Sequence, residues 1–326
     1  MADLRGKMQK LSFFKLPLIF IALFAISSVL LSIIRFVVPL FDELNDLLEF
    51  IFNQYILHQL LNLIPLCLLF FVVSSIVFYR MNIHIITLKN LGLLIIEIVL
   101  IHIVSFLLEQ CQIVYQILFV NIIYLDSWFY LIIIISSLLS CGLYSLLIYY
   151  YIKIFSDWFD KEKYPFELTP KNSPKIHFIL FLAFFFFLFI TLSSFLLDML
   201  LQQFQHDTSC WINVFLLLVS YVINFLMIVL LTKDFFKRTF VVLQSDRIIK
   251  SAIVTNILIL TTGIIFLLVI YNIAYFISRI NSLGLYVLIL LPLAIWLWSS
   301  ILSCMIVRCI TKYYFAMPSK GQIGFN

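Results

Sequence analysis

The sequence predicts an all-α, polytopic integral membrane protein with eight transmembrane helices and both termini in the cytoplasm. Hydrophobic residues make up 64% of the chain and charged residues only 11%, and the mean hydropathy is +1.15. Soluble domains are about 45–50% apolar and about 25% charged, so this composition is not that of a soluble fold. The apolar residues also form long continuous runs, and the basic residues alternate with these runs.

The apolar runs are long enough to be transmembrane helices. A helix needs roughly 20 mostly apolar residues to cross a hydrocarbon core about 30 Å thick. Because backbone polar groups in lipid must be satisfied within the segment, each run is expected to be helical. A β-barrel would instead show short alternating segments. The eight predicted spans are Leu16–Ile34, Tyr55–Tyr79, Leu91–Leu108, Trp128–Tyr151, Ile176–Leu200, Val214–Thr232, Ala252–Ile277 and Leu285–Ile310.

The basic residues assign the two sides of the membrane, because Lys and Arg in short loops are retained in the cytoplasm. All but two of the 21 Lys and Arg residues lie before the first span, at or after the end of the last one, or in every second connection. The two exceptions are Arg35 and Arg279. Both termini are therefore predicted to be cytoplasmic, and the predicted location is the bacterial inner (plasma) membrane. No loop combines a basic run with interleaved aromatic residues, so no nucleic-acid partner is expected.

The chain is predicted to form a single transmembrane domain, 1–326, with possible halves 1–163 and 164–326. The segment Ser136–Cys141 (SSLLSC) recurs as Ser299–Cys304 (SSILSC), exactly half a chain later. Such a pattern is compatible with a parallel 4+4 duplication, as in transporters whose repeats are related by an axis along the membrane normal. Chance is the alternative explanation, since Leu, Ile and Ser dominate all of these helices.

The largest cytoplasmic connection, 152–175, is too short to form a domain with its own core. Its first part, Ile154–Lys163, mixes aromatic and charged residues and is predicted to form a short amphipathic helix at the membrane interface. This loop is the expected contact site for a protein partner, and membrane lipids are the other expected partners.

Few ionisable or strongly polar residues lie within the predicted spans, and such residues tend to face a bundle interior or a wet cavity. Glu97 and His102 lie in the third span, and His58 and Asn62 lie one turn apart in the second. The i, i+5 spacing of Glu97 and His102 places them about 140° apart around the helix, so they do not share a face. These four residues are the candidate intramembrane polar pathway, although hydrogen bonding between helices would also explain them.

The chain has no motif for a metal, a nucleotide or a catalytic nucleophile. Its five His residues are dispersed, and HExxH, GxSxG, GxxxxGK[ST] and GxGxxG are all missing. No catalytic residue, metal or cofactor is therefore predicted, and an enzyme is the weakest of the functions considered.

Cys111 and Cys210 are predicted to lie on the outer side, where they could form a disulfide if that side is oxidising.

These features favour a multi-pass, permease-like transport protein that moves a small or lipid-like substrate through the helix bundle. Glu97 would be the coupling or binding carboxylate, with His58, Asn62 and His102 as polar groups of the cavity. The alternative is a non-catalytic membrane scaffold, such as an accessory subunit or an immunity-type protein, whose buried polar groups only fix helix packing.

Overall fold

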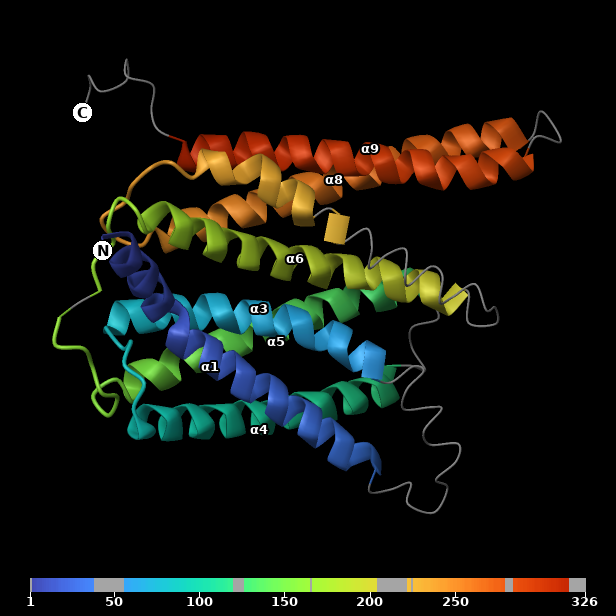
Figure 1. Cartoon of the computed structure of the whole chain (residues 1–326). Helices are drawn as coiled ribbons and strands as arrows, with labels where there is room; N and C mark the ends of the chain where they lie inside the picture. Colours follow the sequence, from blue (N-terminus) through green and yellow to red (C-terminus); the bar gives the residue numbers. More distant parts are fainter. Residues whose placement is uncertain are drawn as a thin grey trace. The chain divides into compact units, whose positions relative to one another are not determined.

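The chain is all-helical in the computed structural model, which describes residues 2–37, 56–119, 126–164, 166–203, 222–223, 225–278 and 284–316 (Figure 1). The long helices are α1 (Ala2–Val37), α3 (Ile56–Met81), α4 (Leu88–Phe119), α5 (Asp126–Ile154), α6 (Ser173–Gln203), α8 (Ser245–Ser278) and α9 (Gly284–Phe315). A short 3-10 helix, η3 (Lys233–Phe235), precedes α8, and residues 222–223 and 225–232 are also helical. The described ranges contain no strand.

Five helices are long and apolar enough to cross a membrane, which indicates an integral membrane protein. Their apolar stretches within the described residues are Phe13–Ile34, Leu63–Met81, Leu88–Cys111, Ile135–Ile154 and Ser173–Leu192. Helices α8 and α9 cover the last two predicted spans, but many of their side chains lie outside the described set. The sixth predicted span, Val214–Thr232, also lies partly outside it. The count of eight therefore stays a prediction.

Helix α4 has a distribution of side chains suited to lipid rather than to water. Its exposed side carries Ile95, Ile96, Val99 and other large apolar residues, whereas the polar Asn90 and Glu97 are fully buried. A helix on the surface of a soluble protein would show the reverse, with its apolar stripe toward the core. The apolar exterior of α4 therefore supports its assignment as a membrane span.

The chain divides into two compact units, of which unit 1 comprises Met1–Leu168 and Phe189–Leu197, and unit 2 comprises Thr169–Leu188 and Asp198–Asn326. In unit 1, α1 packs against α3 and α4, and α5 packs against the same two helices. In unit 2, α8 packs against α9. The duplication predicted for the two halves is not tested by this division.

The turn between α3 and α4 is defined by Asn82, the left-handed residue (φ 56°) that ends α3. The backbone N–H of Ile83 donates to the Phe78 carbonyl (2.9 Å), and that of Asn82 donates to the Tyr79 carbonyl (3.3 Å). These two bonds form a Schellman motif, in which Asn is one of the few residues that accept the left-handed conformation. The turn then places Thr87 at the N-cap of α4, where its hydroxyl oxygen accepts a bond from the Asn90 backbone N–H (3.1 Å).

The segment Ile154–Lys163 does not form the predicted interfacial helix. Helix α5 ends at Ile154, residues 155–158 form turns, and residue 159 is a bend. The buried Asn90 side chain donates to the Asp160 carbonyl (3.1 Å) and accepts from the Asp160 N–H (2.8 Å), while the Thr87 hydroxyl donates to the Asp160 carboxylate (2.7 Å). Because these bonds use the backbone of the segment, they compete with the helical bonds that its amphipathic pattern predicts. We refer to Thr87, Asn90 and Asp160 as the loop clamp.

Candidate functional site

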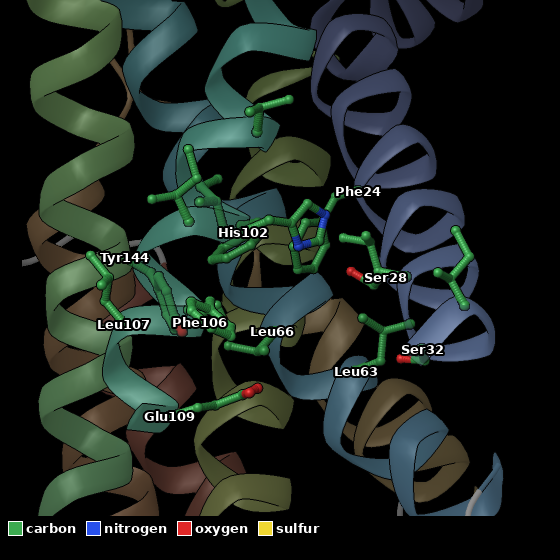
Figure 2. Close-up of a pocket in the computed structure, with 17 residues that line it drawn as sticks. Phe24, Ser28, Ser32, Leu63, Leu66, His102, Phe106, Leu107, Glu109 and Tyr144 are labelled. Carbon is green, nitrogen blue, oxygen red and sulfur yellow. The ribbon is translucent and has the colours of Figure 1, made fainter. Parts of the chain in front are cut away.

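A cavity of about 860 Å³ lies within unit 1 and is lined by residues from α1, α3, α4 and α5 (Figure 2). Most of the lining is apolar, with large side chains such as Phe24, Leu66 and Phe106. The polar lining residues are few, namely Ser28, Ser32, His102, Ser105, Glu109 and Tyr144. A largely apolar cavity with a small number of polar groups is the usual form of a small-molecule site.

His102 is held in place by residues of α1. Its ring stacks on Phe24 with a centroid distance of 5.5 Å and an interplanar angle of 15°. Its Nε2 lies 2.8 Å from the hydroxyl oxygen of Ser27, and that hydroxyl donates its single proton to the Phe24 carbonyl (2.9 Å). The Ser27 hydroxyl therefore lies within hydrogen-bonding distance of both the Phe24 carbonyl and the His102 ring.

A second group of polar residues, Ser105, Glu109 and Tyr144, lines the cavity further along α4. The side chain of Ser105 hydrogen-bonds to that of Tyr144. Figure 2 shows Glu109 at the opposite end of the labelled side chains from His102 and Phe24. Since Ser105 and Glu109 follow His102 at i+3 and i+7, all three lie along one stripe of α4. The cavity therefore has two separate polar positions joined by apolar walls.

Glu97 lies outside this cavity lining, in packed protein. Its side chain is 0% exposed, and neither carboxylate oxygen has a hydrogen-bond partner among the described residues. The buried face of α4 places it between Leu93, Leu94 and Ile101. The nearby Tyr151 hydroxyl donates instead to the Leu93 carbonyl (2.8 Å). Transfer of an unpaired carboxylate to such surroundings is very costly, so this position favours a bound proton.

The structure places the four predicted pathway residues differently. His102 lines the cavity and Glu97 does not, as their predicted angular separation on the helix implies. His58 and Asn62 lie in α3, but their side chains are outside the described set. The pathway built from these four residues therefore stays a prediction. Cys210, the predicted partner of Cys111, is also outside the described residues.

Several residues of the site were not predicted. Ser27, Ser28 and Ser32 lie in α1, and their spacing within an apolar span is a signal that could have indicated a polar helix face. Phe24 and Tyr144 gave no such signal, because aromatic residues are frequent throughout the chain. Their role depends on which helices pack together.

A second buried histidine, His84, lies in the turn between α3 and α4. It is surrounded by the rings of Phe13, Tyr79 and Phe166 at centroid distances of 5.4–6.4 Å. Neither ring nitrogen has a hydrogen-bond partner among the described residues, and burial lowers its pKa to about 4. No group of three His, Cys, Asp or Glu side chains that could hold a metal ion occurs in the described ranges. His84 is therefore assigned a packing role.

No protein-family model, no curated protein and no solved structure matches the chain.

Proposed function

We propose that this protein is a permease-like membrane carrier that moves a small or lipid-like substrate through its helix bundle. The observation on which the proposal rests is the cavity of about 860 Å³ in unit 1, which combines apolar walls with a few polar groups. A scaffold needs no such cavity, because native interiors are packed with few voids larger than a water molecule.

Glu97 is proposed to couple substrate movement to protons. A carboxyl buried without a donor or a cation is stable only when protonated, so release of its proton requires the surrounding helices to rearrange. This property links the protonation state of Glu97 to the conformation of the bundle. His102, and with it His58 and Asn62, would then be polar contacts for the substrate.

Agreement between the buried positions of the two halves supports the proposed 4+4 duplication. Buried positions recur in α5 and α9 after 163 residues, in the register of the repeated SSLLSC and SSILSC segments. The pairs are Cys141 with Cys304, Tyr144 with Val307, Ile148 with Thr311, and Ile152 with Phe315. We therefore propose eight spans in two parallel halves, in a bacterial inner membrane, which is an arrangement known among carriers.

The coupling role is tested by Glu97→Gln in proteoliposomes loaded with a pH-sensitive dye. The vesicles are exposed to a panel of amphipathic amines, alcohols and acids, and proton movement is measured relative to protein-free vesicles. We expect substrate-driven proton movement with the unmodified protein and its loss with Glu97→Gln, because the amide cannot release a proton. Glu167→Gln, the same change at an exposed position, should leave it intact. Equal, pH-independent activity of the Glu97→Gln protein would remove the coupling role.

A scaffold function is the second candidate, and it is favoured by the loop between α5 and α6. The loop clamp holds this loop against α4, yet Trp158 is 61% exposed and Tyr164 is 73% exposed. Exposed aromatic residues on a fixed loop are suited to contact with a protein partner. Purification in mild detergent followed by mass spectrometry separates the two functions: a stoichiometric partner lost on Trp158→Ala would favour the scaffold.

A further inference from the structure

We propose that the cavity of unit 1 takes up one acyl chain of a membrane lipid, which enters sideways from the bilayer on the side bordered by exposed residues of α1 and α4. This inference deepens the carrier function proposed above, because it names the class of substrate, and it rests on that function for its biological meaning. The binding itself can be measured without any transport.

The cavity lies at the depth of the membrane. Its lining residues come from α1, α3, α4 and α5, and each falls within a stretch that is long and apolar enough to cross a bilayer. In α1 and α4 the lining begins at the middle of the stretch and continues toward its end, whereas in α3 it lies in the first half. Because consecutive spans run in opposite directions, these residues occupy the same half of the bilayer, which is the outer half in the predicted topology.

The cavity also has the length of one lipid chain. Its lining extends from Phe24 to Ile34 in α1 and from Val99 to Glu109 in α4. At about 1.5 Å per residue, each of these segments covers about 15 Å along its helix. The hydrocarbon core of a bilayer is about 30 Å thick, so each leaflet contributes about 15 Å. A single chain of one leaflet therefore matches the cavity in length.

The side chains that line the cavity are buried at its deep end and exposed at its edge. Phe24, Phe70 and Tyr144, which lie near the middle of their spans, are buried. Ile34 in α1 and Phe106 in α4 are exposed. Exposed apolar side chains within a span meet lipid tails, which are as apolar as they are. An acyl chain can therefore pass from the bilayer into the cavity without crossing water.

The lining is suited to the chain of a lipid and not to its headgroup. Most of it is apolar, and the described lining residues include no Lys or Arg that could pair with a phosphate. Burial of an unpaired charge in such surroundings is very costly, so the headgroup would stay at the membrane surface. The chain itself gains van der Waals contacts, because it fills a space whose walls would otherwise lack partner atoms.

The test uses phosphatidylcholine that carries a diazirine at the end of one acyl chain. The protein is reconstituted in vesicles containing this lipid and illuminated, and the labelled positions are mapped by mass spectrometry. We expect an adduct at Tyr144, which is 7% exposed but lines the cavity. Tyr151 is the matched control, because it is 6% exposed in the same helix and is not part of the described lining, and it should carry none. The exposed Ile96 of α4 shows that the probe reaches the surface of the protein.

A variant with a smaller cavity locates the chain. Ser28 lines the cavity in α1, so Ser28→Leu fills part of the space (Figure 2). We expect this variant to lose most of the Tyr144 adduct and to keep the labelling of Ile96. Ser140→Leu makes the same change in α5 at a serine outside the described lining, whose hydroxyl donates to the Ser136 carbonyl of its own helix. This control should keep the Tyr144 adduct.

The proposal is overturned if Ile96 is labelled in the unmodified protein but Tyr144 is labelled no more strongly than Tyr151, a result that does not depend on the folding of any variant. It is also overturned if Ser28→Leu folds and keeps the full Tyr144 adduct. The expected Tyr144 adduct, together with no proton movement in proteoliposomes, would support this site and count against the carrier function. Proton movement without the adduct would overturn the acyl-chain site and leave the carrier function standing.

Discussion

At the scale of single residues, His84 and Glu97, two deeply buried ionisable groups among the described residues of unit 1, have different surroundings. His84 is enclosed by aromatic rings at the end of α3, whereas Glu97 lies within a membrane span. Both lack hydrogen-bond partners among the described residues. An unpaired neutral imidazole costs less free energy to bury than an unpaired carboxylate, and this difference is the reason that the proposed coupling role is given to Glu97.

His84 predicts a loss of stability in acid. Burial lowers its pKa from the ordinary value of 6.5 to about 4 in the folded protein, so between these values the unfolded chain binds more protons than the folded one. The contribution of the neutral His84 to the free energy of unfolding is therefore fully present above about pH 6.5. It falls by roughly 2–3 kcal/mol as the pH approaches 4.

His84→Phe should flatten this dependence while preserving the aromatic packing. The measurement is the unfolding midpoint in detergent from pH 7.5 to 4.5, for the variant and for the unmodified protein. Because the two proteins share all of their other His residues, a difference between the two curves comes from residue 84. Parallel curves for the two proteins would show that His84 is not the group responsible.

At the scale of elements, the helices were predictable from sequence and the cavity was not. Predicted spans such as Trp128–Tyr151 lie within observed helices, here α5, because a continuous apolar run in lipid has no alternative to helix. The contact between Ser27 and His102 joins residues 75 positions apart, and nothing in a local pattern specifies that α1 packs against α4.

The prediction for Ile154–Lys163 was wrong for the same reason, namely that a local pattern does not show contacts with residues far away in the chain. Its amphipathic composition favours a helix when considered alone. The structure instead satisfies its backbone through Asn82 and Asn90, which lie about 70–80 positions earlier in the chain. Glu162 donates its N–H to the Asn82 carbonyl (3.3 Å) and accepts from the Asn82 side chain (3.0 Å).

The loop clamp predicts that Asn90 stabilises unit 1. Asn90→Leu removes two donated bonds, to Ile85 and Asp160, and one accepted bond from Asp160, and leaves buried backbone groups unpaired. We expect a loss of about 2–4 kcal/mol in stability, together with faster chymotryptic cleavage at Trp158. The measurements are the unfolding midpoint and limited proteolysis in detergent.

Lys161→Ala is the matched control for this loop. It removes only the exposed ion pair with Asp157 (3.0 Å) and should change stability by less than about 1 kcal/mol. An Asn90→Leu protein as stable and as resistant to cleavage as the control would show that the clamp does not hold the loop.

At the scale of the whole molecule, the two proposed halves have some buried positions in common but differ in the polar residues that they bury. Buried positions of α4 recur in α8 after 158 residues, and in the proposed duplication this register pairs Glu97 with Thr255 and Ile98 with Asn256. Thr255 donates to the Ser251 carbonyl (2.6 Å) and Asn256 to the Ala252 carbonyl (2.9 Å), both within α8, and Asn256 also donates to the Phe185 carbonyl of α6 (3.4 Å). The proposed coupling carboxyl thus belongs to the first half alone.

The most direct test of the central claim, a membrane-embedded chain of two parallel four-span halves, is its topology. Two reporters, one active only in the cytoplasm and one active only outside it, are fused in turn after Glu162 and after Asn326. We predict that the cytoplasmic reporter alone is active at both positions, because each half crosses the membrane four times. Activity of the external reporter after Asn326 would contradict both the span count and the parallel arrangement of the halves.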